Sequence, residues 1–573
     1  MEETGFFDDF GLLLILAARE GDVTGTQELI DAKINIETKD KNGNTALMWA
    51  MSRGHTSCAR VLIDAKADLE AKDNEGYTAL LAATHMGQAS AARILIEAKA
   101  DINSRTKDGM TPLMVAAQLG ETACAQVLLE AKADVEAVDE EGLNALSWAA
   151  NMGHCECMQA VIDAKAALEG SHKEGYTALL AAVNRGHTEC AQVLITSKAN
   201  LSAKNNDGVA ALAMAAAAGH TACVDILINA KADVDVKDET GYTSLIYAAN
   251  EGHTASIRML IDAKADVNSE GLYRANALFS AAKRGYAECV CMLIDAKADL
   301  NATDFNGYTP LCSAASGGHS ACVRFLIEAK AVVDPEVSGR NTALMLAADD
   351  GHEECVHILM EARACVNAVG EDGLTALIAA ARGGHSRLVR SFIDAKADLT
   401  TRTDKRFTAL ISAAHEGHSD CVQILIDAKV DVNAKNDSGS CALSAASNKG
   451  HTECVRALIK AKANPNSKNS LLYNSLILAA RGGHRECAQI LIDAKADINA
   501  ELHNGMTALM SAVSDGHAAY AQLLIDARAD IEVHNHAGRS ALMLAASEGQ
   551  TECIQILLES LIRIAHYFRP FLL

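Results

Sequence analysis

The sequence lacks the features that mark two broad classes of protein. No stretch reaches the ~20 apolar residues that a membrane-spanning helix needs, so we expect no membrane insertion. Basic residues are not in excess: the net charge is −23, and because phosphate binding needs a basic surface, we expect no nucleic-acid partner. The acidic residues are spread along the chain, which favours solubility and is compatible with a basic partner.

Catalytic motifs are also lacking. There is no G-x-S-x-G, no phosphate-binding loop and no pair of carboxylates outside a repeating frame. An Asp or His that recurs once per repeat is interpreted as part of the scaffold. We therefore predict that the protein is not an enzyme and has no cofactor, metal ion or small-molecule substrate.

The chain has no Ser/Pro-rich linker, because one unit of 33 residues recurs from end to end. Gly175–Lys198, GYTALLAAVNRGHTECAQVLITSK, shows its form as two short helices. Thr177 is suited to cap the first helix, since its hydroxyl accepts a hydrogen bond from an unpaired N–H. Gly186 ends that helix and His187 opens the second. The faces predicted to be buried are Leu179, Ala182 and Val183 on the first helix and Cys190, Val193 and Leu194 on the second.

The register of this unit is unbroken. A glycine stands at all 17 positions spaced by 33 residues from Gly21 to Gly549. The Thr177 position holds Thr, Ser or Asn in 14 of 16 copies, with Ala210 and Cys441 as the exceptions. Helices this short are marginal alone, so each unit must pack against its neighbours. A fixed period with constant stop and cap positions is typical of a solenoid.

The repeat resembles the ankyrin repeat, D-x-x-G-x-T-P-L-H-x-A-A-x-x-G-H followed by L-L and G-A-D-V-N. It reads DFNGYTPLCSAASGGH at Asp304–His319 and EDGLTALIAAARGGH at Glu371–His385, with Glu371 in the usual Asp place. The resemblance covers residues 10–560 and implies an all-α solenoid with short β-hairpin loops, an ankyrin helix-turn-helix stack of about 16–17 repeats.

The sequence departs from the family pattern in three ways. The His of T-P-L-H is always replaced, Pro stands beside it only at Pro112 and Pro310, and the glycine that opens the hairpin loop is a basic residue throughout. We expect an acidic lead at 1–9, the solenoid at 10–560 with caps at 10–42 and 538–560, and an apolar tail at 561–573. The tail extends or caps the last helix; the alternatives are a docking tail or truncation of a larger protein.

Cysteines follow the same frame. Twelve of the 17 lie at the Cys190 position, where other copies have Ala91, Leu388 or Tyr520, so the position is interpreted as packing. This indicates reduced thiols in an intracellular compartment, and we expect the cytoplasm, with the nucleus as an alternative. The His187/Cys190 spacing could ligate zinc, but its recurrence once per repeat favours packing. From the family resemblance we expect the histidine to hydrogen-bond locally at the inter-helix turn.

A basic residue stands at the end of the second helix of each repeat, as at Lys66 and Lys99. All 16 positions are Lys or Arg, which complements the helix dipole. An anion-binding row is the alternative, although nearby acids such as Asp64 and Asp68 neutralise it.

Two sets of residues are candidates for contacts with a partner. In the second half of the chain, alternate hairpin tips lose their glycine and carry residues typical of interfaces; a simple duplication of two units is the alternative. These residues are Tyr273, Arg274, Arg340, Arg406, Phe407, Leu472 and Tyr473. Variable positions before the G-H pair form the second set: Arg53, Met86, Arg185 and Arg284. Trp49, Trp148 and Tyr247 share one register and are interpreted as packing, with a partner-facing anchor as the alternative.

The resemblance implies a non-enzymatic scaffold or adaptor that binds protein through a pre-ordered concave face and hairpin tips. The alternatives are a targeting or regulatory module of a larger enzyme or channel, and a structural spacer.

Overall fold

The computed structural model describes residues 4–334 and 339–568. They form two compact units: the N-terminal unit, Met1–Ala281 with Cys291–Asp299, and the C-terminal unit, Ala282–Val290 with Leu300–Leu573. The helices of the first half are α1 Thr4–Glu20, α2 Val23–Asp31, α3 Ala46–Ser52, α4 Thr56–Asp64, α5 Ala79–His85, α6 Ala89–Glu97, α7 Pro112–Leu119, α8 Thr122–Glu130, α9 Ala145–Met152, α10 Cys155–Asp163, α11 Ala178–Arg185, α12 Thr188–Thr196, α13 Ala211–Ala218, α14 Thr221–Asn229, α15 Ser244–Glu251, α16 Thr254–Asp262, the 3-10 turn η1 Leu272–Arg274, α17 Ala277–Arg284 and α18 Ala287–Asp295.

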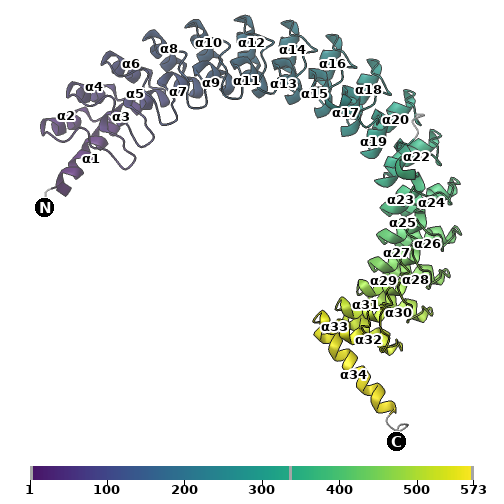
Figure 1. Ribbon diagram of the computed structural model, residues 1–573. Helices are drawn as coiled ribbons and strands as arrows, with labels where there is room; N and C mark the ends of the chain where they lie inside the picture. Colours follow the sequence, from purple (N-terminus) through teal and green to yellow (C-terminus); the bar gives the residue numbers. More distant parts are fainter. Residues whose placement is uncertain (1–3, 335–338, 569–573) are drawn as a thin grey trace. The chain divides into compact units, whose positions relative to one another are not determined.

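The helices of the second half are α19 Pro310–Ser316, α20 Ser320–Glu328, α21 Ala343–Asp349, α22 Glu353–Glu361, the 3-10 turn η2 Glu371–Gly373, α23 Ala376–Gly383, α24 Ser386–Asp394, α25 Ala409–Glu416, α26 Ser419–Asp427, α27 Ala442–Lys449, α28 Thr452–Lys460, α29 Ser475–Arg481, α30 Arg485–Asp493, α31 Ala508–Ser514, α32 Ala518–Asp526, α33 Ala541–Ser547 and α34 Thr551–Phe568. Within each unit the odd-numbered first helices lie side by side in one layer and the even-numbered second helices in another (Figure 1). Each hairpin loop projects next to the first-helix layer.

The predicted caps and stops form. Thr177 Oγ1 accepts a hydrogen bond from the Leu180 N–H at 3.4 Å, and Gly186 ends α11 with φ +78°. Ala210 has no side-chain oxygen, and α13 has no side-chain cap. At Cys441 the Ser444 hydroxyl accepts a hydrogen bond from the Cys441 N–H at 2.9 Å. The N-cap prediction is therefore confirmed, together with both of its exceptions.

The core lies between the two helix layers of each unit. Leu179, Ala182 and Val183 are buried as predicted, and so are Cys190 and Leu194. Val193, predicted to be buried, is half-exposed, and Ala191 is buried in its place, because the face of α12 toward the core is rotated by part of a turn. All twelve cysteines at the Cys190 position are buried, which confirms their use as packing residues. Burying each Leu contributes ~1.5–3 kcal/mol.

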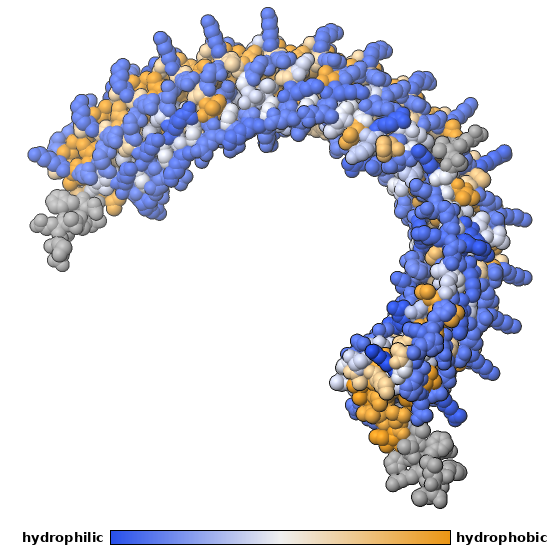
Figure 2. Space-filling view, viewed as in Figure 1, coloured by the Kyte–Doolittle hydropathy of each residue, from blue (hydrophilic) through white to orange (hydrophobic). Residues whose placement is uncertain are grey.

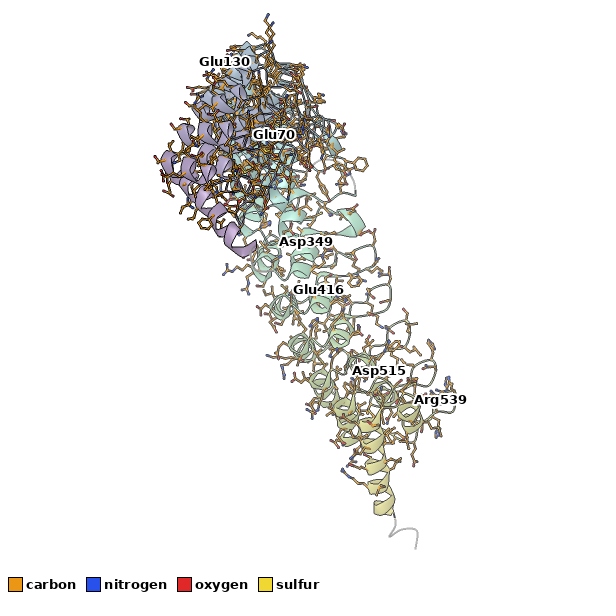
Figure 3. All side chains as sticks on the ribbon, turned by 90° about the vertical axis from the view of Figure 1, so that its left-hand side faces the viewer. Glu70, Glu130, Asp349, Glu416, Asp515 and Arg539 are labelled. Carbon is orange, nitrogen blue, oxygen red and sulfur yellow. The ribbon has the colours of Figure 1, made fainter. Side chains whose placement is uncertain are left out.

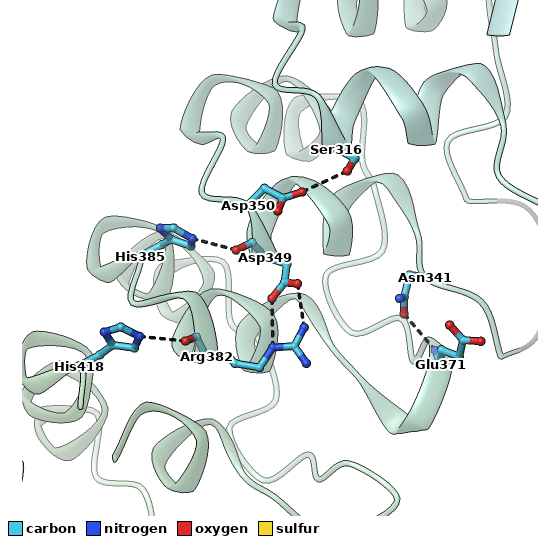
Figure 4. Close-up of polar contacts among 8 residues, drawn as sticks. All are labelled: Ser316, Asn341, Asp349, Asp350, Glu371, Arg382, His385 and His418. Carbon is cyan, nitrogen blue, oxygen red and sulfur yellow. Dashed lines mark hydrogen bonds and ion pairs between the residues drawn. The ribbon is translucent and has the colours of Figure 1, made fainter. Parts of the chain in front are cut away.

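The histidine does not bond locally, so that expectation is wrong. His187 Nε2 lies 3.1 Å from the carbonyl oxygen of Asn151, which belongs to the preceding repeat. A carbonyl can only accept, so the Nε2–H donates. The bond satisfies a carbonyl at the end of the first helix, a group that has no partner within its own helix. Equivalent bonds occur in both units, each from a histidine to the carbonyl of the residue 36 positions earlier. One example joins His385 to Asp349 O at 2.9 Å (Figure 4).

A second side chain links successive repeats. The polar residue in the Asn/Glu position of the loop accepts a hydrogen bond from a backbone N–H 31 residues later. Glu136 Oε1 accepts from the Ala167 N–H at 2.7 Å, and Asn499 Oδ1 accepts from the Asp530 N–H at 2.9 Å. Backbone groups that no helix can satisfy are thus paired across repeats.

The basic residues at the second-helix ends adopt an unexpected conformation. Lys66 and Lys198, like the others of this row, have φ near +60 to +70°, the left-handed region that glycine favours. The helix dipole explains the charge of these residues but not their backbone conformation. The backbone strain of about 1–2 kcal/mol per residue was not foreseen.

The hairpin loops carry only isolated β-bridges in the part of the chain that the structure describes, Lys204 with Ala210 and His534 with Ser540. Asp73 shows what the hairpin Asp does: its Oδ1 accepts the Glu75 and Tyr77 N–H groups at 2.9 and 2.8 Å. The structural register puts Gly370, not Glu371, at that position, because Gly373 is the hairpin glycine. Without the Asp, this loop forms the 3-10 turn η2 instead.

The terminal helices extend beyond the repeat frame. α1 begins at Thr4, so residues 4–9 of the expected lead are helical, and α34 continues through the start of the expected tail to Phe568. Apolar residues lie on the surface of α34, where Leu558 and Ile562 are exposed (Figure 2).

Candidate protein-binding grooves

The shared aromatic register braces the hairpins of the N-terminal unit. Trp49 Nε1–H donates to Asp40 Oδ2 at 2.9 Å, Trp148 Nε1–H to Asp139 Oδ2 at 2.9 Å, and the Tyr247 hydroxyl to Asp238 Oδ2 at 2.6 Å. Burial alone would raise the pKa of Asp40 and Asp238, but these bonds and backbone N–H donors outweigh it and lower both. The aromatic side chain thus ties a first helix to its own hairpin.

A groove opens where this aromatic residue is replaced. Position 82 has Ala instead of Trp, and the space beside it has a volume of 470 Å³. We call it the Trp49 groove; it lies between α3, α5 and their hairpins. Its lining residues are Asn44, Met48, Trp49, Ser52, Arg53, Asp73, Glu75, Tyr77, Ala82, His85 and Met86.

The Asp73 carboxylate differs from its counterpart Asp40. Its Oδ1 is occupied by two backbone N–H groups, but its Oδ2 has no hydrogen-bond partner among the described residues, because Ala82 cannot donate. Tyr77 and His85 make an edge-to-face contact beside it, with ring centroids 5.7 Å apart. The groove therefore combines a free carboxylate oxygen with aromatic walls.

Arg53 and Met86, both selected from the sequence, line this groove. Arg53 lies over the Trp49 ring at 5.9 Å, and Arg19 lies 5.6 Å from the same ring centroid. The Met86 side chain is 51% exposed. An exposed thioether beside an aromatic ring is an adaptable apolar contact surface.

Arg185 and Arg284 lie at equivalent first-helix ends but outside any groove described here. Arg185 Nε–H donates to Asn151 Oδ1 at 3.3 Å, in the preceding repeat. Arg284 is exposed at the carboxyl end of α17.

The C-terminal unit has a smaller groove of 270 Å³, which we call the Phe407 groove. It forms beside Ser412, another small residue in the aromatic register. It is lined by Asp372, Leu374, Ile378, Arg382, Thr403, Asp404, Lys405, Phe407, Ser412, His415 and Glu416. Phe407 and His415 make an edge-to-face contact with centroids 6.4 Å apart.

Three of the charged or titratable side chains at this second groove, Arg382, His415 and Glu416, are already paired. Arg382 makes a two-point ion pair with Asp349, with Nη2 at 2.7 Å from Oδ2 (Figure 4). Glu416, at the carboxyl end of α25 (Figure 3), accepts from His415 Nδ1 at 2.9 Å, and this bond lowers the Glu416 pKa. Arg382 and Glu416 are therefore less available to a partner than the free Oδ2 of Asp73 in the Trp49 groove.

The hairpin residues selected from the sequence have different surroundings. Tyr273 is 68% exposed at φ +57°, and Arg274 pairs with Glu270 at 3.2 Å on the surface, a contact of small energetic value. Arg340 Nη1–H donates to Asn306 O at 2.6 Å, so its guanidinium covers the preceding hairpin. Gly339, not Arg340, has the positive φ there, which shifts the turn by one residue.

Of the remaining positions, Arg406 and Leu472 adopt the glycine conformation without being glycine. Arg406 and Leu472 have φ +59° and +64°. Tyr473 is half-buried with the Arg481 guanidinium 5.4 Å from its ring centroid. Arg406 is exposed and Leu472 is partly exposed.

Asp73 and Tyr77 are groove residues that the sequence patterns did not single out. The available signal was the aromatic register itself: a small residue at position 82 next to Trp49 leaves the hairpin Asp of its own repeat without a donor. Among the described residues, no cluster of three or more His, Cys, Asp or Glu is arranged to hold a metal ion. Within the same residues, no helix has the length and apolarity needed to cross a membrane.

A sequence model of ankyrin repeats, three copies in length, matches residues 14–106, 98–170, 162–238, 230–304, 278–370, 365–436, 429–501 and 476–566. The chain belongs to the ankyrin repeat family. Ankyrin repeats are protein–protein interaction modules, and the fold is generally a non-catalytic scaffold.

The crystal structure of the human ASB11 ankyrin repeat domain is similar in sequence, with 26% identity and a TM-score of 0.37. The match covers 39% of this chain and 100% of that one. Among curated proteins, none matches this ankyrin repeat chain.

Proposed function

We propose that this ankyrin repeat protein is an intracellular, non-enzymatic scaffold or adaptor that holds a segment of a partner protein in the Trp49 groove. The observation that carries the proposal is the free Oδ2 of Asp73 beside the Trp49 ring and the exposed Met86. A partner that donates a hydrogen bond to this carboxylate gains binding energy, because a hydrogen bond to a charged group is worth ~1.5–3 kcal/mol.

The chemistry of the groove selects the segment. A basic side chain fits Asp73 and the neighbouring Glu75, and an apolar side chain next to it packs between Trp49, Tyr77 and Met86. The groove walls come from helices and from hairpins held by backbone hydrogen bonds. Little ordering entropy is therefore lost on binding.

The Phe407 groove and the exposed hairpin residues are proposed as secondary contacts along the same partner. Their role is weaker because Arg382 and Glu416 are already paired. We propose no cofactor, substrate or nucleic acid for either groove.

The test is selection of a random 12-residue peptide library on the full-length protein. The expected winners pair Lys or Arg with a neighbouring apolar residue, and Asp73→Asn weakens them at least tenfold. Asp139→Asn is the matched control: it occupies the same register, but Trp148 already uses that carboxylate, so binding is unchanged. Failure to select any peptide, or equal loss in both variants, contradicts the proposal.

A further inference from the structure

In some repeats the N1 residue of the second helix contacts the packing cysteine of the next repeat. Thr188 Oγ1 lies 3.5 Å from Cys223 Sγ, and Thr452 Oγ1 lies 3.6 Å from Cys487 Sγ. These contacts join residues 35 positions apart. They are part of the regular packing between neighbouring second helices.

In one repeat this contact is between two thiols. Cys155 begins α10, and its Sγ lies 2.8 Å from the Sγ of Cys190 in α12. A disulfide needs sulfurs ~2.05 Å apart, so a shift of less than about 1 Å would bring this pair to bonding distance. At this N1 position the other copies have residues such as Thr, Ser or Ala; Cys155 is the one cysteine there in the sequence.

The two thiols differ in access to solvent. Cys155 is partly exposed at the amino end of its helix, whereas Cys190 is completely buried. Burial, and the hydrogen bond with Cys155, raise the pKa of Cys190. An oxidant from solvent therefore reacts with Cys155 first. Cys190 is the thiol that lies close enough to react with the oxidised Cys155.

We propose that Cys155 and Cys190 form a peroxide-sensitive modification site that closes a disulfide between neighbouring repeats. In the first step the Cys155 thiol loses its proton and its sulfur attacks hydrogen peroxide, the O–O bond breaks, the leaving hydroxide takes up a proton, and Cys155 sulfenic acid and water form. In the second step Cys190 sulfur attacks the Cys155 sulfur, the S–O bond breaks, and a second water leaves. The pair of thiols loses two hydrogens and two electrons to one peroxide.

The consequence is a covalent link between α10 and α12. The disulfide replaces a non-covalent contact between the two helices. The two repeats therefore cannot separate until a thiol reductant restores both thiols. The other cysteines at the Cys190 position have no cysteine at the N1 position of the preceding repeat, so they do not form this disulfide.

The test treats the reduced full-length protein with hydrogen peroxide, alkylates the remaining thiols and digests with trypsin and a protease that cuts after Glu. Cleavage after Glu156 separates Cys155 from Cys157, so each linkage gives a different peptide pair. We expect Cys155 joined to Cys190, a mass loss of about two hydrogens per site, and full reversal by dithiothreitol.

Two variants make the outcome decisive. Cys155→Thr introduces the residue of the neighbouring repeats and should abolish the link, whereas Cys157→Ala, a residue found in the packing row at Ala91, should retain it. A Cys155–Cys157 link, sulfinic acid on Cys155 without a cross-link, or no oxidation at Cys155 would each overturn the proposal. Exposed Cys365 is replaced by Ser in all samples to prevent links between molecules.

Discussion

Every repeat but the last adopts the left-handed backbone conformation at the end of both of its helices, yet the two ends use different residues. Gly186, at the end of α11, has φ +78°, and Lys198, after α12, has φ +67°. The first position is glycine in every copy, and the second is always Lys or Arg. Backbone conformation alone would favour glycine at both.

The difference comes from what the next repeat places there. A Cβ on Gly186 would lie 2.8 Å from the ring of His220, which packs against it. Lys198 is exposed and nothing comparable covers it. Glycine is therefore required where a neighbour closes on the backbone, and a cation is tolerated where the side chain can leave toward solvent.

The largest effect is expected for Gly186→Ala. The variant meets both the unfavourable φ and the His220 ring, so we expect a local loss of about 2–3 kcal/mol in opening free energy. Hydrogen–deuterium exchange of the amides in α11 and α13 measures this locally, because a solenoid opens in parts. Gly549→Ala is the control: no atom lies within 4 Å of its Cβ, so only the φ cost of about 1 kcal/mol should remain. Equal losses of opening free energy at both positions would show that the His220 ring does not contribute.

A double-mutant cycle tests the ring directly. His187→Ala removes the bond to Asn151 O and should cost ~1 kcal/mol at this junction. In that background Gly153→Ala should cost about 1 kcal/mol less than in the wild type, because His187 no longer occupies the space above Gly153. Additive effects of the two substitutions would show that ring and glycine act independently.

The smallest effect has the opposite sign. Lys198→Gly relieves the left-handed strain but loses a charge at the helix end and gains unfolded-state entropy, so we expect a net gain of ~0.5 kcal/mol. The same exchange measurement at α12 checks it. Lys198→Ala keeps the strain and should give no gain; a gain from Ala as large as that from Gly would point to charge, not conformation.

Much of the fold could be predicted from the sequence because the repeat multiplies each local signal. Thr177, Gly186 and the buried face of α11 were all identified correctly, since capping, helix termination and apolar spacing depend on neighbouring residues. The rotation that buries Ala191 in place of Val193 could not be predicted, because it depends on how α12 meets its neighbours.

Less of the candidate site than of the fold could be predicted from the sequence. Arg53 and Met86 were selected because they vary beside a constant glycine, and they line the Trp49 groove. Asp73 was not selected, because a hairpin Asp recurs in several repeats and is distinguished from Asp40 only by the residue nine positions later, Ala82 in place of Trp49. Only the space left by Ala82 distinguishes the two carboxylates.

The sequence by itself determined the repeat, its family, the start and stop of the helices within the repeat frame, and the use of cysteine for packing. These properties depend on short-range spacing that recurs in every unit. Tertiary structure decided which groups of one repeat complete the next: the histidine bond to a carbonyl 36 residues back and the thiol contact of Cys155 with Cys190. Both contacts depend on the distance between neighbouring units, and the spacing of residues within a single unit does not determine that distance.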